Sequence, residues 1–146
     1  MSTRFNYAKV YPQVLEKMLE MENFAKSTGI EPKLYELIKI RASQINGCAF
    51  CLNMHTVDSR ALGEEERRIY LLDAWRETTY YTEKEKAALE LTEYVTKISE
   101  AGVPDEVYDR VRKQFDEKET IGLVIVINTI NSWNRIAIST KMMPPA

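Results

Sequence analysis

Cysteine and histidine are scarce in this chain, which has two cysteines and one histidine in 146 residues. Two cysteines are too few for the disulfide framework that stabilises many small secreted domains. The first residues contain no apolar stretch of the kind found in a signal or transit peptide. We therefore expect a cytoplasmic protein, in which the cysteines have a catalytic or metal-binding role in preference to a structural one.

The chain also lacks an excess of charge of either sign, because 20 basic residues nearly balance 22 acidic ones. A net charge of −2 provides no basic surface for a polyanion, so nucleic acid is not an expected partner. The longest apolar run, residues 121–127, is far shorter than the ~20 residues that a membrane-spanning helix needs. No membrane partner is therefore expected.

Glycine and proline are infrequent, with five of each, and they separate long segments with helical periodicity. We predict an all-α fold, a single domain over residues 1–146 with about six to seven helices. The predicted helices cover residues 14–26, 33–44, 48–62, 64–77, 82–102, 105–115 and 119–140. A capping box, in which Thr82 and Glu85 exchange hydrogen bonds, marks the start of the fifth.

The segment from Glu119 to about Thr140 is the most difficult to assign. Its residues 121–130 are largely β-branched and apolar, a pattern that also suits a buried strand. The sequence offers no second strand of similar quality, and one strand cannot make a sheet. We therefore interpret the segment as a buried helix, despite its modest intrinsic helix propensity.

The scarce reactive residues are concentrated in one motif. Glu36 is followed by Cys48, Cys51 and His55, in the pattern E-x11-C-x2-C-x3-H. Two cysteines three positions apart can form a disulfide or share a metal ion. A histidine four residues after the second cysteine lies one turn further along the same helical face, within reach of a thiol. This spacing predicts a redox enzyme that works through the two cysteines.

The position of the motif in its predicted helix favours ionised sulfur. Cys48 follows Gly47, a strong stop signal, and is predicted to begin a helix, where free backbone amides and the helix dipole stabilise a thiolate. The effect matters because a free thiol, with a pKa of ~8.5, is only about 3% ionised at neutral pH. His55 can accept the proton of Cys51 and later return it to a leaving group. Glu36, on the preceding helix, can orient the imidazole.

The motif and its surroundings closely resemble a known family. Residues 37–48 read LIKIRASQINGC, and together with the motif they are similar to the core of the alkylhydroperoxidase D-like proteins of the carboxymuconolactone decarboxylase superfamily. The strong similarity covers residues 32–63, and a weaker one extends to residue 135. The resemblance implies an all-α fold, assembly into a homo-oligomer (a trimer or a hexamer), and thiol peroxidase activity that needs no cofactor and no metal.

The resemblance also implies roles for the four residues of the motif. Cys51 attacks a hydroperoxide and becomes a sulfenic acid, and Cys48 condenses with it to form a disulfide. Glu36 and His55 relay protons to and from Cys51. The expected partners are a hydroperoxide substrate and a dithiol or thioredoxin-like reductant. The best-known peroxidases of the family have a further histidine between the cysteines, where this chain has alanine and phenylalanine.

Two other interpretations of the motif remain open. In the first, the cysteine pair forms a disulfide slowly and changes assembly without turnover, as a redox-sensing module. In the second, Cys48, Cys51, His55 and Glu36 supply the four ligands of a structural zinc ion. The three interpretations differ in whether the protein consumes peroxide, only responds to it, or holds a metal.

Overall fold

The computed structural model describes residues 2–146, and in this part of the chain every regular element is a helix. In chain order the helices are α1 (Tyr7–Val10), α2 (Pro12–Lys26), α3 (Pro32–Asn46), α4 (Ala49–Ala61), α5 (Glu66–Tyr70), the 3₁₀-helix η1 (Leu72–Glu77), α6 (Glu83–Thr96), α7 (Ile98–Ala101), α8 (Asp105–Gln114) and α9 (Glu117–Thr140). The prediction of an all-α fold is confirmed.

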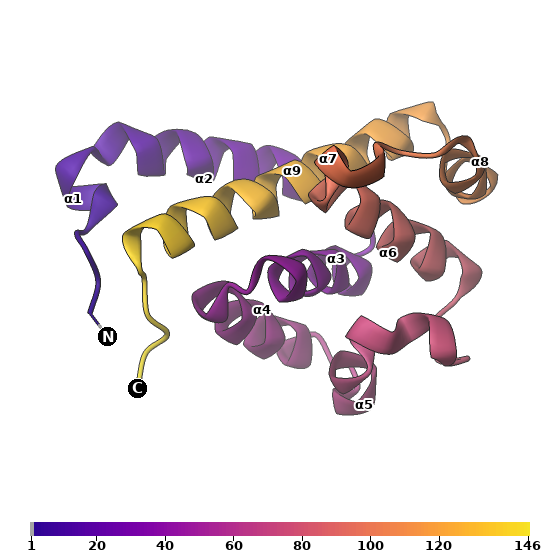
Figure 1. Ribbon diagram of the computed structural model, residues 1–146, viewed down its shortest axis with the longest axis horizontal. Coiled ribbons are helices and arrows are strands. Elements are labelled where there is room, and N and C mark those ends of the chain that lie inside the picture. The colour runs from indigo at the N-terminus through magenta and orange to yellow at the C-terminus, as the bar shows by residue number, and fades with distance from the viewer. Residues whose placement is uncertain (1) are drawn as a thin grey trace.

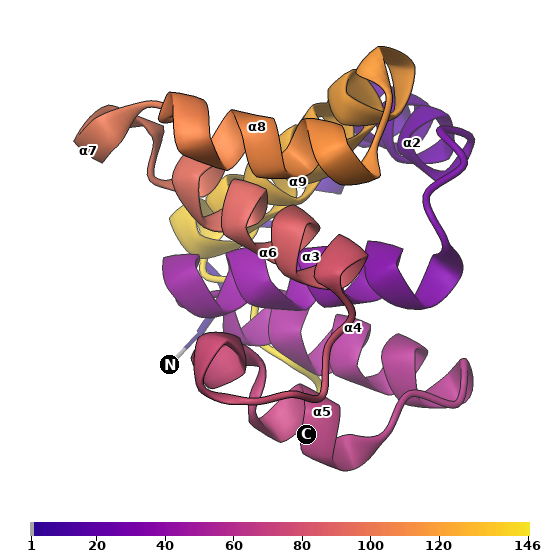
Figure 2. The same cartoon turned by 90° about the vertical axis from the view of Figure 1, so that its right-hand side faces the viewer.

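Helix α3 lies at the centre of the molecule (Figure 1). It packs against α4 on one side and α9 on the other, and α6 crosses it (Figure 2). Helix α2 runs alongside α9 and completes the layer above α3 in Figure 1. Because α3 is surrounded, residues 34–40 are all buried, and the charged members of this run must find partners inside the protein.

The apolar core has two main parts, which share α3. The larger part lies between α3 and the helices α2, α6, α8 and α9, and it contains Ala25, Leu34, Ile38, Ala88, Leu91, Val111, Leu123 and Ile127. The second lies between α3, η1 and α6, and it contains Leu37, Ile40, Leu72, Trp75, Tyr81 and Leu89. Burial of each large aliphatic side chain contributes about 1.5–3 kcal/mol. The two parts together fix α3 in place.

The C-terminal apolar segment forms the helix α9, as predicted, and begins two residues earlier than Glu119, at Glu117. A capping box between Asp116 and Glu119 sets this start. By length and composition alone α9 could cross a membrane, but 50% of its most apolar window is buried inside the protein. Core helices of globular proteins share these properties, and α9 packs against α2, α3 and α6.

The predicted number of six to seven helices is wrong, because residues 2–146 contain ten helical segments. One extra segment is α1, where the Asn6 side chain accepts hydrogen bonds from the backbone N–H groups of Ala8 and Lys9. Four residues are too few to produce a periodic pattern in the sequence. A second extra segment, α7, arises because the predicted helix 82–102 is interrupted at Lys97, whose φ and ψ are −101° and 41°.

The predicted helix 64–77 is also divided, into α5 and η1. Glu64 is buried and precedes α5, and its carboxylate pairs with Arg68 at 2.7 Å between Oε1 and Nε. The Tyr81 hydroxyl donates to the carbonyl oxygen of Arg68, which a continuous helix would use for its own next turn. Tyr81 therefore takes the place of a backbone donor at the Arg68 carbonyl, and the helix breaks at Leu71.

Arg68 is expected to be important for stability. Its guanidinium binds Glu64 and Glu85, and the three side chains are only 16%, 2% and 12% exposed. The substitution Arg68→Met leaves two carboxylates without a counter-charge, so we expect it to lower the free energy of unfolding by about 3 kcal/mol. Urea denaturation measures this loss. The control Arg67→Met, at an exposed neighbouring position where the guanidinium lies over the Tyr80 ring, should lower stability by no more than about 1 kcal/mol. An equal loss in both variants would contradict the prediction.

Both termini lie at one end of the molecule (Figure 1). The backbone N–H of Arg4 donates to the carbonyl of Thr140 at 2.8 Å, and its guanidinium donates to the carbonyl of Ser139 at 3.0 Å. These two bonds hold the segment before α1 against the end of α9. Residues from both terminal regions therefore meet near the cysteines.

Candidate functional site

The two cysteines lie at the beginning of α4. Gly47 ends α3 in the left-handed conformation, with φ 71°, which glycine adopts without steric cost. Cys48 is then the N-cap residue of α4, and its sulfur accepts a hydrogen bond from the backbone N–H of Cys51 at 3.4 Å. The predicted helix start is confirmed, and the sulfur of Cys48 lies at the positive end of the helix dipole.

Cys48 and Cys51 are joined by a disulfide, with their Cα atoms 5.4 Å apart. Their residues are only 1% and 3% exposed, so the pair is buried in the protein. The structure therefore represents the oxidised state of the pair. This state is compatible with a redox role.

Glu36 and His55 face each other across the contact between α3 and α4. The distance between Nδ1 of His55 and Oε2 of Glu36 is 2.9 Å, and both side chains are buried. When the carboxylate is ionised it can only accept a hydrogen bond, and Nδ1 is then the donor of this pair. In the neutral imidazole, Nε2 is then free to accept a proton. The turn before Cys48 brings Glu36 to the histidine, as the sequence predicted.

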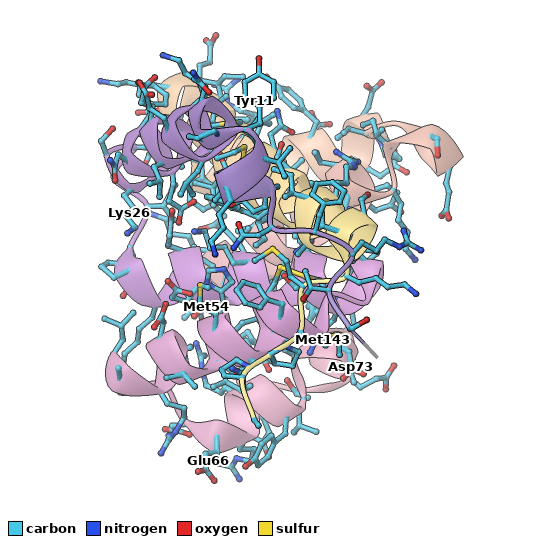
Figure 3. All side chains as sticks on the ribbon, turned by 90° about the vertical axis from the view of Figure 1, so that its left-hand side faces the viewer. Tyr11, Lys26, Met54, Glu66, Asp73 and Met143 are labelled. Carbon is cyan, nitrogen blue, oxygen red and sulfur yellow. A yellow bond between two sulfur atoms is a disulfide. The ribbon has the colours of Figure 1, made fainter. Side chains whose placement is uncertain are left out.

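A cavity of about 290 Å³ lies beside Cys51 and His55. Most of its lining is apolar or aromatic and comes from α1, α2, α4, α9 and the C-terminal tail: Tyr7, Leu15, Leu19, Phe50, Met54, Trp133, Ala137 and Met142. Figure 3 views the molecule from the end where the termini lie, with Met54 labelled. Cys48 is not part of the lining. Of the two cysteines, it is therefore Cys51 that a molecule in the cavity would meet.

Besides the histidine, the described residues contribute one carboxylate to the lining of this cavity, that of Glu22 on α2. It forms an ion pair with Lys39, whose residue is completely buried, and it accepts hydrogen bonds from the Tyr35 hydroxyl at 3.1 Å and the Trp133 indole at 3.3 Å. Burial by itself would raise the pKa of Glu22, but the Lys39 charge and these hydrogen bonds hold that pKa below its ordinary value. Glu22 is therefore ionised at neutral pH.

Sequence reasoning did not identify Glu22 or Lys39. The available signal was the position of Lys39, between Ile38 and Ile40 in a helix with apolar residues on several sides. A lysine at such a position is costly to bury without a partner. The sequence gives no indication that its partner is Glu22, on another helix.

A buried network of amides fixes the turn that leads to the cysteines. The Asn46 side chain donates to the Oδ1 atoms of Asn131 and Asn134, both at 2.9 Å. Asn134 in turn donates to the Ser43 hydroxyl at 3.0 Å. The last turn of α3 is thereby tied to α9 on one side, just before the chain turns into α4.

The structure also bears on the zinc interpretation. In this oxidised state Cys48 and Cys51 are bonded to each other, so the four-ligand set with His55 and Glu36 is not assembled. A different set, Glu36, His55 and Asp58, has ligand atoms that all lie within 4.8 Å of one another. This set shares its two buried members with the carboxylate–histidine pair already described, and its third member is exposed.

A larger groove, of about 350 Å³, lies between α6 and α8. Its lining is mostly charged or polar and consists of Trp75, Glu83, Lys86, Ala87, Glu90, Arg110, Lys113 and Gln114. It contains no thiol and no imidazole. The smaller cavity beside Cys51 is therefore the candidate functional site.

The all-helical fold, the cysteine pair at the start of a helix and the buried carboxylate–histidine pair agree with the resemblance to alkylhydroperoxidase D-like proteins. The sequence model of the carboxymuconolactone decarboxylase family matches residues 12–94, more than half of the chain. The chain belongs to this family, and the resemblance found in the sequence is confirmed. The catalytic roles of Cys48, Cys51, His55 and Glu36 stay predictions.

The chain is also similar to proteins of known sequence or structure. The chain is 52% identical over 139 residues to the uncharacterized protein YdfG of Bacillus subtilis, with 95% of each chain covered. It is 43% identical to a protein of unknown function from Agrobacterium tumefaciens, provisionally named antioxidant defence protein AhpD, with TM-score 0.96 and 99% of each chain covered. The alkylhydroperoxidase AhpD core of an uncharacterized peroxidase-related protein from Ralstonia eutropha shares the fold alone, with TM-score 0.83, 16% identity, and 94% of this chain and 74% of that chain covered.

Proposed function

We propose that this protein is a thiol-dependent reductase of apolar organic hydroperoxides. The observation that supports it best is that Cys51 and His55 line one apolar cavity while Cys48 is bonded to Cys51. A thiol peroxidase of this type needs a sulfur that a peroxide can reach, a proton donor beside it and a second thiol. The three groups are present in the N-cap and the first two turns of α4.

The first step takes place in the reduced protein. The Cys51 thiolate attacks the terminal oxygen of the hydroperoxide, an S–O bond forms, and the O–O bond breaks. His55, protonated in the same site, donates a proton to the departing alkoxide, which leaves as an alcohol. Glu36 stabilises the charged imidazole through its contact with Nδ1. Cys51 is oxidised to a sulfenic acid, and the hydroperoxide is reduced by two electrons.

The second step closes the disulfide. The Cys48 thiolate attacks the sulfenic sulfur of Cys51, so that the S–S bond forms and the S–O bond breaks. The hydroxide leaves as water with the proton that the Cys48 thiol released when it ionised. The helix N-terminus favours the thiolate form of Cys48 before this attack. A dithiol or thioredoxin-like reductant then restores both thiols by exchange. The disulfide in the structure corresponds to the product of this step.

The proposed substrate class follows from the lining of the cavity. Removal of apolar surface from water contributes about 25 cal/mol per Å², so a mostly apolar cavity favours an organic hydroperoxide over hydrogen peroxide. We also propose a homo-oligomer, a trimer or a hexamer, in the cytoplasm. The exposed apolar side chains of Tyr11, just before α2, of Phe24, on α2, and of Val57, on α4, support an oligomer.

The proposal is tested by adding excess cumene hydroperoxide and dithiothreitol to the reduced protein and following peroxide loss. We expect many equivalents to be consumed per chain, and mass spectrometry of a sample without reductant should find a Cys48–Cys51 bridge within one chain. Hydrogen peroxide should react more slowly. Consumption that stops at one equivalent in the presence of reductant would contradict the proposal and support a redox-sensing module.

A further inference from the structure

The carboxylate of Glu22 has an unused acceptor position. Within residues 2–146, its Oε1 atom accepts from both Lys39 and Tyr35, whereas Oε2 accepts from Trp133 alone. A carboxylate offers about four acceptor sites, two on each oxygen. Glu22 and Trp133, which donates to Oε2, both line the cavity beside Cys51.

The environment of Glu22 lets it accept a hydrogen bond without repelling a thiolate. Lys39 neutralises its charge, and the Tyr35 and Trp133 donors fix the orientation of the carboxylate. The three donors come from α3 and α9, and Glu22 comes from α2, so the group is held by three helices. The side chain of Glu22 keeps 13% of its surface exposed, whereas that of Lys39 keeps 1%. The carboxylate is therefore the part of this ion pair that a cavity occupant can reach.

We propose that Glu22 binds the hydroxyl hydrogen of the hydroperoxide, so that the cavity selects apolar molecules that end in one O–H group. This inference rests on the proposed function and adds a substrate-binding residue to it. An R–O–O–H molecule has one donor, on the terminal oxygen, and this is the oxygen that a thiolate attacks. Binding of that hydrogen by Glu22 directs the terminal oxygen to Cys51 and leaves the inner oxygen for the proton of His55.

Glu22 should also discriminate against molecules in the cavity that lack a hydrogen-bond donor. An ether or a dialkyl peroxide of the same size buries equal apolar surface but leaves the carboxylate oxygen desolvated and unpaired. An alcohol, which is also the product of the proposed reaction, keeps the donor. The role of Glu22 can therefore be tested by ligand binding alone, without turnover.

The first experiment compares two reactions of Cys51 in the reduced protein. Glu22→Met/Lys39→Met removes both charges together and leaves no hydrogen-bond acceptor at position 22, and Glu20→Gln, an exposed carboxylate on the same helix, is the matched control. We expect the double variant to react with cumene hydroperoxide about 10-fold to 100-fold more slowly than wild type. Its alkylation by iodoacetamide, which has no hydroperoxide group, should change by less than about 3-fold. Equal slowing of both reactions would overturn the inference.

The second experiment uses ligands that do not react. 2-Phenyl-2-propanol and its methyl ether are compared for their protection of Cys51 against iodoacetamide. We expect the alcohol to protect wild type at about 10-fold lower concentration than the ether, and this preference should vanish in the double variant. If the double variant does not fold, Glu22→Asp, which keeps the charge and withdraws the carboxylate by one methylene, should lose the same preference.

The outcomes separate this inference from the proposed function. A wild-type protein that consumes no hydroperoxide but prefers the alcohol, with the preference lost on substitution of Glu22, supports the binding role and contradicts the reductase. A protein that reduces hydroperoxides with no preference for the alcohol, or with a preference that survives the substitution, overturns the role of Glu22 and leaves the reductase intact.

Discussion

Cys51→Ser is expected to lower the rate of hydroperoxide reduction by about 10³-fold or more. A serine hydroxyl is not ionised at neutral pH and cannot replace the thiolate as the attacking group. Cys51 is the cysteine that lines the cavity with His55, so no other sulfur of the motif is placed to take over. Peroxide consumption under excess dithiothreitol, measured in the linear phase, gives the rate for each variant.

The matched control is Cys48→Ser, which removes the same disulfide but leaves Cys51 in place. We expect this variant to consume one equivalent of hydroperoxide rapidly and to accumulate a sulfenic acid, which dimedone traps and mass spectrometry locates at Cys51. Further turnover should be slow because the resolving thiol is absent. Rapid reaction in Cys51→Ser, with trapping at Cys48, would show that the two roles are reversed.

His55→Gln is expected to reduce the rate by about 10²-fold to 10⁴-fold, the usual contribution of a positioned acid–base group. Glutamine is close in size and can still hydrogen-bond to Glu36, so the contact between α3 and α4 is preserved. It cannot take the proton of Cys51 or return it to the alkoxide. Stopped-flow measurement of the first oxidation step isolates this effect from reduction of the disulfide.

The pH dependence of this variant gives a second readout. Without the imidazole, the thiolate must form by simple ionisation, so its rate should rise about 10-fold per pH unit until the thiol is ionised. Glu36→Gln should show the same trend with a smaller loss, because the imidazole remains but is no longer oriented by a carboxylate. Asn53→Ala, on the exposed side of α4, serves as the control. A His55→Gln profile that matches wild type at every pH would contradict the proton relay.

Local signals predicted the parts of the structure that depend on neighbours in the chain. The stop at Gly47, the capping box at Thr82 and the buried helix at the C-terminus all appear as expected. Their physical causes act within a few residues: a left-handed cap, a pair of side chain–backbone hydrogen bonds, and an apolar segment without a partner strand. The pairing of Glu36 with His55 was also predictable, because a short turn joins their helices.

The wrong predictions share a different cause. The segment 64–77 has a continuous helical pattern. However, the Arg68 guanidinium donates to Glu85, and the Arg68 carbonyl accepts from the Tyr81 hydroxyl, both more than ten positions away. Partners so far away in the sequence do not alter the local hydrophobic pattern, which predicts one helix for this segment. The division at Lys97 has the same consequence for the helix count.

The sequence alone determined the all-α class, the dithiol at a helix start and the carboxylate–histidine pair, because each depends on spacing along one or two adjacent helices. Only the tertiary structure decided that Cys51, and not Cys48, lines the cavity, and that the carboxylate of Glu22 lines it too. Glu22 and its donor Trp133 are 111 positions apart and meet only because α2 packs along α9. The chemistry of the cysteines depends on residues that are close in the sequence. The shape and polarity of the cavity beside Cys51 depend on packing between segments that are far apart in the sequence.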